Sequence, residues 1–238
     1  MDVGTLNLKT REDWLRSKLA SIPSGSRILD AGAGEQQYKR FCSHLKYVSQ
    51  DFAEYDGKGD GLGLQQAKWD YGKLDIVSDI TRIPEPNESF DAVMCIEVFE
   101  HLPDPVDAIR EFSRLLQNGG YLILTAPFCS LTHFAPYHFY SGFNRFFYER
   151  FLPEHGFLIK EIQANGNYFE YLAQEVRRIP WASEKYSGRK SRVLQPIANM
   201  LMLQTLSRMS KEDKGSSELL NFGFNVLAVK NNDPDHND

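Results

Sequence analysis

The sequence predicts an α/β protein with a doubly wound, mostly parallel, seven-stranded sheet and an antiparallel last strand. Short apolar segments alternate with amphipathic ones from residue 27 to residue 125, as in strands joined by crossover helices. The last two predicted strands lack a crossover helix of that kind, so the final strand is expected to insert antiparallel beside its predecessor. The predicted strands are 27–30, 47–50, 75–77, 90–96, 121–125, 157–162 and 225–230.

Capping and breaking residues predict the helices. Thr10 and Asp13 are spaced like a capping box, which indicates a first helix. Asp104 followed by Pro105 indicates another, which Asn118-Gly119-Gly120 is expected to close. Further helices are expected after Gly34 with Tyr38, Phe41, Cys42 and Leu45 on one face, at about 64–67, at 142–155 and at 193–209.

Composition and length favour one sizeable core. The chain has 238 residues, of which 42% are hydrophobic. We expect a single domain at 1–230 with a helical insertion at about 167–218, and a disordered tail at 231–238. No apolar run is long enough for a membrane span and no signal peptide is evident, so a soluble, cytoplasmic protein is predicted. A net charge of −5 argues against a nucleic-acid partner, and the odd count of three cysteines argues against a disulfide framework.

Small and acidic residues follow several predicted strands. Gly32 and Gly34 follow Asp30, with Ala31 and Ala33 between them, and glycines there permit a sharp turn and close approach to a ligand. Asp51 ends the second strand and Asp79 the third. Because ligands bind beyond the carboxyl ends of parallel strands, these positions predict a site for a nucleotide-like cofactor, although any one aspartate is as often a turn residue.

The glycine pattern argues against a nicotinamide dinucleotide. The dehydrogenase fingerprint needs a third glycine at position 37, where Gln37 stands. From Ser26 to Phe128 the chain instead resembles the class I S-adenosylmethionine-dependent methyltransferases of the small-molecule type called type 11. The segments that carry the resemblance are LDAGAGEQQY, YVSQDF, DIVSDITRIP, FDAVMCIEVFEHL and LLQNGGYLILTAPF. Gln36 departs from the family pattern, which often has glycine there.

The resemblance implies a Rossmann-like methyltransferase fold with S-adenosyl-L-methionine as cofactor. It implies that the glycine turn passes the methionine portion, that Asp51 binds the ribose, and that Asp79 and Ile80 recognise adenine. The cofactor-binding residues expected on this basis are Asp30, Gly32, Gly34, Asp51, Phe52, Asp79, Ile80, Ile96 and Glu97.

Histidines and aromatic residues predict the acceptor side of the site. A hydroxyl acceptor is improved by a base, and His101 and His138 are the candidates. Residues 128–151 hold 10 aromatic residues in 24, so this segment is expected to cover the acceptor pocket, with His133, Tyr137 and Tyr140 lining it. No metal is expected, because His133 and His138 lack an obvious third ligand.

The sequence therefore predicts a methyltransferase that acts on a small molecule, most simply at a hydroxyl of a sugar or of a nucleotide- or lipid-linked metabolite. The alternative is a non-catalytic protein of the same fold that binds S-adenosylmethionine or serves as a scaffold. Basic residues between 177 and 192 indicate either a solvated surface or a phosphate site. A monomer and a homodimer are both compatible with the sequence.

Overall fold

The computed structural model describes residues 2–65, 68–188 and 194–231. The chain forms two compact units. One unit contains Met1–Asp13 and Ala164–Gly223, and the other contains Trp14–Gln163 and Phe224–Asp238. The expected single domain with a helical insertion at about 167–218 stays a prediction. The helices α4, α5 and η3 lie in that stretch, within the first unit.

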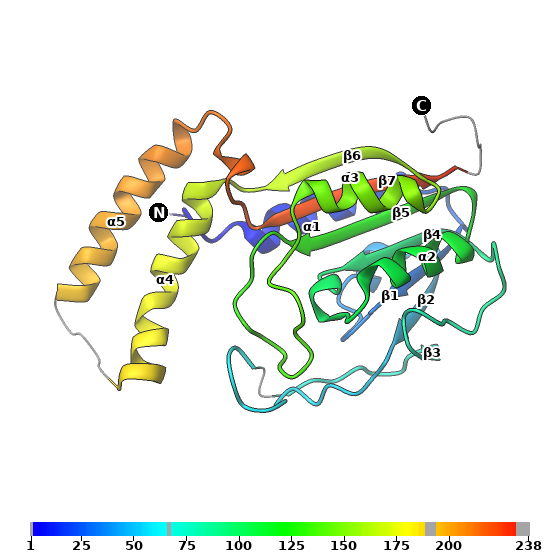
Figure 1. Ribbon diagram of the computed structural model, residues 1–238, viewed down its shortest axis with the longest axis horizontal. Helices are drawn as coiled ribbons and strands as arrows, with labels where there is room; N and C mark the ends of the chain where they lie inside the picture. The colour runs from blue at the N-terminus through cyan, green and yellow to red at the C-terminus, as the bar shows by residue number, and fades with distance from the viewer. Residues whose placement is uncertain (1, 66–67, 189–193, 232–238) are drawn as a thin grey trace. The chain divides into compact units, whose positions relative to one another are not determined.

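The predicted fold class is confirmed. Seven strands form one sheet in the order β3-β2-β1-β4-β5-β7-β6, and the pairs β1–β2, β1–β4, β2–β3 and β4–β5 are parallel. The last strand, β7, lies between β5 and β6, and its arrow runs opposite to theirs in Figure 1. The strands are β1 (Arg27–Ala31), β2 (Lys46–Asp51), β3 (Ile76–Val77), β4 (Phe90–Ile96), β5 (Leu116–Pro127), β6 (Phe157–Asn165) and β7 (Gly223–Lys230).

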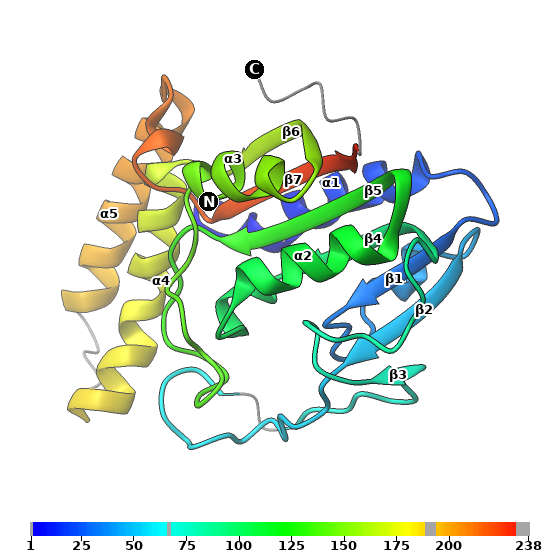
Figure 2. The same cartoon turned by 45° about the vertical axis from the view of Figure 1, so that its right-hand side comes forward.

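Helices cover both faces of this sheet. α2 and α3 lie on one face, and the second half of α1 lies on the other (Figures 1 and 2). Trp14, Leu15 and Leu19 of α1 pack with Ile28 and Met94 of the central strands in a buried cluster. The helices are α1 (Asn7–Ala20), α2 (Pro105–Leu115), α3 (Arg145–Glu154), α4 (Tyr168–Ser187) and α5 (Leu194–Lys211), with short 3-10 helices η1 (Lys39–Phe41), η2 (Phe99–His101) and η3 (Ser216–Glu218).

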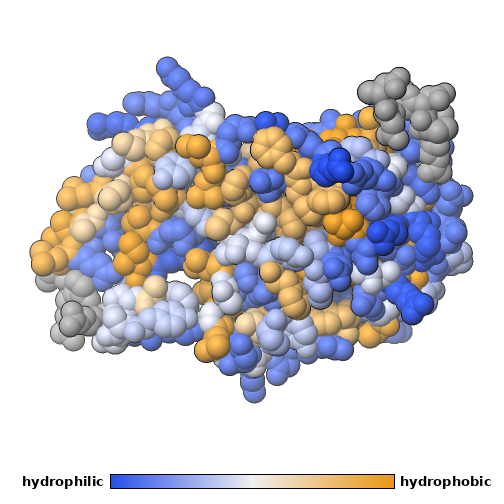
Figure 3. All heavy atoms as spheres, viewed as in Figure 1, coloured by the Kyte–Doolittle hydropathy of each residue, from blue (hydrophilic) through white to orange (hydrophobic). Residues whose placement is uncertain are grey.

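The first unit contains a hairpin of α4 and α5. Its small core holds Val3, Ala173 and Leu206. Much apolar surface remains exposed on these helices, as the orange atoms in Figure 3 show, including Leu194 and Leu201 of α5. Despite this, none of the helices in the described part of the chain is long and apolar enough to cross a membrane.

The predicted helix after Gly34 is wrong. Residues 35–38 form turns, and the short η1 follows them. Gln36 takes a left-handed backbone conformation with φ +56°, which interrupts helical geometry. Its side-chain amide donates to the carbonyls of Tyr71 and Lys73, which holds the turn. Tyr38 and Cys42 still pack into the core as the apolar pattern predicts.

Three smaller expectations also need correction. The first helix begins at Asn7, so Thr10 lies inside the helix and is not its cap. The Thr10 hydroxyl donates to the Leu6 carbonyl. Leu64 forms a bridge with His133 instead of a helix, and residues 66–67 lie outside the described residues. Asn118-Gly119-Gly120 lies inside β5, because that strand begins at Leu116, directly after α2. The predicted tail from 232 onward also lies outside the described residues.

Candidate functional site

The glycine turn follows β1 and is hydrogen-bonded to the end of β2. Gly32 and Gly34 have positive φ values of +75° and +50°. The Gly32 N–H donates to the Gln50 carbonyl at 2.9 Å, and the Gly34 N–H donates to Oδ2 of Asp51 at 2.9 Å. A Cβ at Gly32 would lie 2.6 Å from Cγ2 of Val98, so the turn has no room for a side chain there. The turn and the carboxylate of Asp51 therefore form one hydrogen-bonded unit.

Asp51 is suited to hold polar groups of a cofactor. Its side chain is only 6% exposed, and it also accepts from the Ala53 N–H at 3.1 Å. Burial raises the pKa of this carboxyl, and the backbone donors at Ala53 and Gly34 oppose that rise. A carboxylate has about four lone-pair sites, so these bonds leave capacity for hydroxyl donors. Phe52, the next residue, is exposed beside it.

Asp30 lies deeper than Asp51. It is 2% exposed and accepts a hydrogen bond of 2.5 Å from the Tyr47 hydroxyl. Burial raises the pKa of Asp30 to about 7, the Tyr47 bond counteracts the rise, and the nearby charge of Asp51 adds to it. The structure thus encloses Asp30 beside β2, where its carboxylate is bonded to Tyr47.

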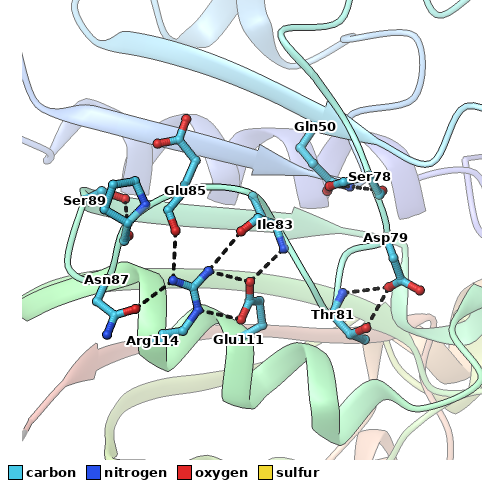
Figure 4. A network of polar contacts seen from close by, with 11 residues as sticks. Gln50, Ser78, Asp79, Thr81, Ile83, Glu85, Asn87, Ser89, Glu111 and Arg114 are labelled. Carbon is cyan, nitrogen blue, oxygen red and sulfur yellow. Dashed lines mark hydrogen bonds and ion pairs between the residues drawn. The ribbon is translucent and has the colours of Figure 1, made fainter.

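Asp79 and Ile80 follow β3. Asp79 is exposed, and its Oδ1 accepts from the N–H and the hydroxyl of Thr81, both at 2.8 Å. Ile80 is buried. The segment after them is held to α2 by Arg114 and Glu111, as Figure 4 shows.

Arg114 and Glu111 act as a clamp on residues 83–87. Arg114 donates to the carbonyls of Ile83 at 3.0 Å and Glu85 at 2.8 Å, and it pairs with Glu111 at 2.7 Å. Glu111 also accepts from the Ile83 N–H at 2.7 Å. These contacts position the loop that carries Asp79 and Ile80.

Ile96 ends β4, and Glu97 directly follows it. Ile96 is buried, and Glu97 has a left-handed φ of +56°. The Glu97 N–H donates to the Thr125 carbonyl, and its Oε1 accepts from the Thr125 hydroxyl, both at 2.9 Å. Because β1 pairs in parallel with both β2 and β4, the groups that follow these strands meet at one edge of the sheet. The sequence-predicted cofactor residues are therefore brought together.

The aromatic segment after β5 lies against η2. The Nδ1–H of His101 donates to the Tyr137 carbonyl at 2.5 Å. The N–H groups of Phe139 and Tyr140 donate to the Glu100 carbonyl at 2.9 and 3.2 Å. These bonds fix the expected acceptor segment over the residues that follow β4.

The same segment also reaches the residues after β2. The rings of Phe52 and Tyr137 meet edge to face with centroids 5.0 Å apart, and the Tyr137 hydroxyl donates to Glu54 at 3.3 Å. Phe134 packs against Trp69 with centroids 5.1 Å apart. A Cβ at Gly34 would lie 2.8 Å from the Trp69 ring, so this aromatic group extends to the glycine turn.

The three candidate histidines form a cluster. The ring of His133 lies 4.6 Å from that of His101 and 4.8 Å from that of His138, measured between centroids. Nε2 of His138 bonds with the Ser130 hydroxyl at 3.1 Å. Burial, followed by the neighbouring His133, lowers the pKa of His101 to about 3, and the same causes lower the pKa of His138. Both rings are therefore held neutral near pH 7.

Sequence reasoning missed one member of this site, Trp69. Trp69 belongs to an irregular segment with no periodicity to mark it, and its place is shown by its approach to Gly34 and its packing against Phe134. Glu100 stands beside His101 in the sequence, but its approach to His133 depends on the fold. Tyr140, expected in the acceptor pocket, lines a separate cavity of about 390 Å³ at the start of α2, together with Asp104, Phe143 and Phe147, whereas His133 and Tyr137 do not line it.

Comparisons with known proteins agree with this arrangement. Residues 29–124 match the family described as "Methyltransferase domain". The chain is 37% identical over 119 residues to the "Ubiquinone biosynthesis O-methyltransferase" of Xanthomonas oryzae pv. oryzae, which covers 48% of this chain and 48% of that protein. It is 27% identical over 187 residues to the "Demethylmenaquinone methyltransferase" of Deinococcus radiodurans, covering 74% of this chain and 71% of that protein. The chain thus spans about half the length of the first curated relatives it matches.

A solved structure shows the same fold. The chain superposes on an S-adenosylmethionine-dependent methyltransferase from Archaeoglobus fulgidus with a TM-score of 0.56 at 14% identity, covering 93% of this chain and 94% of that one. At that identity the likeness concerns the fold alone. Residues 29–124 are therefore similar to a methyltransferase domain, and the chain shares its fold with a solved S-adenosylmethionine-dependent methyltransferase.

Proposed function

We propose that this protein transfers a methyl group from S-adenosylmethionine to a hydroxyl of a small-molecule acceptor. The observation that carries the proposal is the presence of two groups at the carboxyl ends of the parallel strands. One is the Gly32–Gly34 turn bonded to Asp51, and the other is the histidine cluster formed by His101 after β4 and by His133 and His138 after β5. The family match at residues 29–124 supports a methyltransferase, and the O-methyltransferase name of the Xanthomonas relative supports oxygen as the acceptor atom.

The residues present fit this cofactor. The turn offers backbone close to the ligand without a Cβ at Gly32 or Gly34, and Asp51 can accept from both hydroxyls of a ribose. Asp79 is exposed beside the buried Ile80, as expected for a pair that meets an adenine edge and face. Ile96 and Glu97 would then lie beside the methionine end of the cofactor.

When bound, S-adenosylmethionine supplies a methyl group on a sulfonium, so an O–C bond forms as the C–S bond breaks and the electron pair stays on sulfur. The protein must align the acceptor and receive its proton. We assign the proton to His138, whose Nε2 lies at the Ser130 hydroxyl and can exchange that partner for an acceptor. His101 suits this role less, because a pKa of about 3 makes it a weak base.

The acceptor side favours a ring compound. Phe52, Phe134 and Tyr137 present aromatic faces and edges between the glycine turn and the histidines. One curated relative is named for ubiquinone biosynthesis and the other for demethylmenaquinone, which supports an acceptor with a flat ring. A sugar or a nucleotide- or lipid-linked metabolite would stack on the same surface.

Calorimetric titration with S-adenosylmethionine and S-adenosylhomocysteine tests the cofactor. Asp51→Ala is expected to weaken binding by about 100-fold, because it removes a carboxylate that accepts several hydrogen bonds. Asp107→Ala is the matched control, because Asp107 lies exposed on α2 and pairs with Arg110. No binding by the wild-type protein, or equal binding by Asp51→Ala, would contradict the proposal.

Turnover with a panel of hydroxylated ring compounds tests the reaction itself. His138→Gln is expected to lower the rate by about 100-fold or more while leaving cofactor affinity unchanged, because a general base contributes that much. His155→Gln, a histidine on α3's C-terminal side, serves as the control. Cofactor binding with no methyl transfer to any compound would favour the non-catalytic alternative.

A further inference from the structure

Helix α5 exposes apolar side chains along one side. The residues that recur there at helical spacing, each at least 45% exposed, are Leu194, Ile197, Leu201, Met202 and Met209. Another side of the helix already packs toward α4, because Leu206 is buried in a cluster with Ala173. Figure 3 shows the apolar surface over this helix as orange atoms. The helix is therefore apolar both where it is covered and where it is not.

No charge interrupts this surface for most of the helix. From Leu194 to residue 207 the sequence of α5 contains no charged residue, and the first charge is that of Arg208. A helix that is apolar on several sides is ordinarily buried, and a large exposed apolar patch marks a contact with a protein or a membrane. We therefore expect a partner to cover the outer side of α5.

Basic residues accompany the apolar side. The last turn of α5 has Arg208 and Lys211, and the last turn of α4 has Lys185. Among the described residues 177–188 and 194–211, five are basic and Glu184 alone is acidic. The whole chain has a net charge of −5, so this hairpin is positive on a chain that is otherwise acidic. Such a surface attracts anionic partners.

Aromatic rings lie beside Lys185. Its Nζ is 5.3 Å from the ring centroids of Trp181 and of Tyr186, and these two rings are 6.1 Å apart. Trp181 is 40% exposed and Tyr186 is 64% exposed. Tryptophan, tyrosine and lysine each join an apolar body to a polar tip, so they suit the boundary between lipid headgroups and acyl chains.

We propose that α5 and the end of α4 dock this protein on the surface of an anionic lipid bilayer. The apolar side of α5 would enter the boundary between headgroups and acyl chains, with the helix axis parallel to the bilayer plane. Lys185, Arg208 and Lys211 would contact the negatively charged headgroups. Trp181 and Tyr186 would lie at the level of the headgroups beside them.

The charge on this surface favours a bilayer over a second copy of the chain. In a two-fold dimer the same surface faces itself, so α5 would meet α5 of the other copy. Arg208 and Lys211 would then find no carboxylate on the opposing helix, because α5 contains none. An anionic bilayer supplies both an apolar layer for Leu194 and Leu201 and negative charge for the basic residues.

Co-sedimentation of the tag-free protein with lipid vesicles tests the docking without cofactor or acceptor. Vesicles of phosphatidylcholine mixed with phosphatidylglycerol are expected to bind it at least about 10-fold more tightly than phosphatidylcholine alone, with a preference that falls as salt rises. Leu194→Glu should lower the affinity by about 10-fold or more, because it removes apolar surface and adds negative charge. Leu62→Glu is the matched control, because Leu62 is 65% exposed and belongs to the other unit.

Two further variants test charge and depth. Lys185→Gln should lower the affinity for the mixed vesicles by about fivefold, as expected for one cation at an anionic surface. Arg110→Gln, which removes an exposed cation of α2, should not lower it. Brominated acyl chains should quench tryptophan fluorescence in the wild-type protein and in Trp14→Phe, since Trp14 is buried, and should quench it much less in Trp181→Phe.

Three results would overturn the docking surface: no binding to the anionic vesicles, equal binding by Leu194→Glu and Leu62→Glu, or a dimer in solution that Leu194→Glu dissociates. The last result would mean that a second copy covers α5. The test is separate from that of the proposed function. A protein that binds vesicles but not S-adenosylmethionine keeps the docking surface and loses the function, and the reverse result removes the docking surface alone.

Discussion

At the scale of single residues, two neighbouring carboxylates differ in what surrounds them. Asp51 receives backbone donors from Gly34 and Ala53, which favour its charged form. Asp30 is fully enclosed and receives only the Tyr47 hydroxyl among the bonds recorded for its carboxylate in the described residues. The two carboxylates therefore differ, because Asp51 can face a ligand and Asp30 lies enclosed beside β2.

Asp30 predicts a pH-dependent stability. Its native pKa of about 7 lies above the ordinary value of 3.8, so the native state holds this proton more tightly than the unfolded state does. Its contribution to the unfolding free energy therefore falls as pH rises from about 4 to about 7. Asp30→Asn cannot ionise, so it should remove that fall and be more stable than the wild-type protein at pH 8 by about 2–4 kcal/mol.

Urea unfolding at pH 5, 6, 7 and 8 measures this effect. The exposed Asp107→Asn should leave the pH dependence unchanged, which separates the enclosed carboxyl from general charge effects. If the unfolding free energy changed with pH in the same way in Asp30→Asn and in the wild-type protein, Asp30 would not titrate in this range.

At the scale of elements, the turn after β1 needs glycine at position 32 for two reasons: the positive φ and the lack of room for a Cβ. A comparison with Gly25 separates the two costs. Gly32 and Gly25 both have positive φ, but only Gly32 would bring a Cβ against Val98, while a Cβ at Gly25 meets nothing within 4 Å. Gly25→Ala should cost about 1 kcal/mol through the backbone alone. Gly32→Ala should cost about 2–4 kcal/mol, because overpacking is added.

Chemical denaturation of both variants measures the difference. Gly32→Ala should also weaken S-adenosylmethionine binding, whereas Gly25→Ala should not. Equal stability losses in the two variants would mean that Val98 yields without cost.

The clamp on α2 gives a second prediction at this scale. Arg114→Leu would remove the guanidinium that donates to Glu111 and to the carbonyls of Ile83 and Glu85, so we expect a loss of about 2 kcal/mol in unfolding free energy. Arg110→Leu, on the same helix, removes an exposed pair with Asp107 and should cost under about 0.5 kcal/mol. Thermal and urea unfolding would contradict this expectation if the two losses were equal.

At the scale of the whole molecule, periodic patterns predicted the strands and most helices well, because burial on one face imposes them. Errors arose where contacts distant in sequence decide. Gln36 breaks the expected helix after Gly34 because the carbonyls of Tyr71 and Lys73 hold it. Asn118-Gly119-Gly120 reads as a helix end, yet β4 pairs with β5 as early as Leu116, so the three residues lie within the strand.

The sequence alone determined the doubly wound sheet, the antiparallel last strand, and the strand-end positions of Gly32, Asp51 and Asp79. Each follows from local spacing and from the rule that parallel strands end at a common edge. The convergence of Glu100 with His133 was decided by the tertiary structure. The loop after β5 folds back on η2 through bonds between residues far apart in the chain, and no local pattern encodes such a meeting.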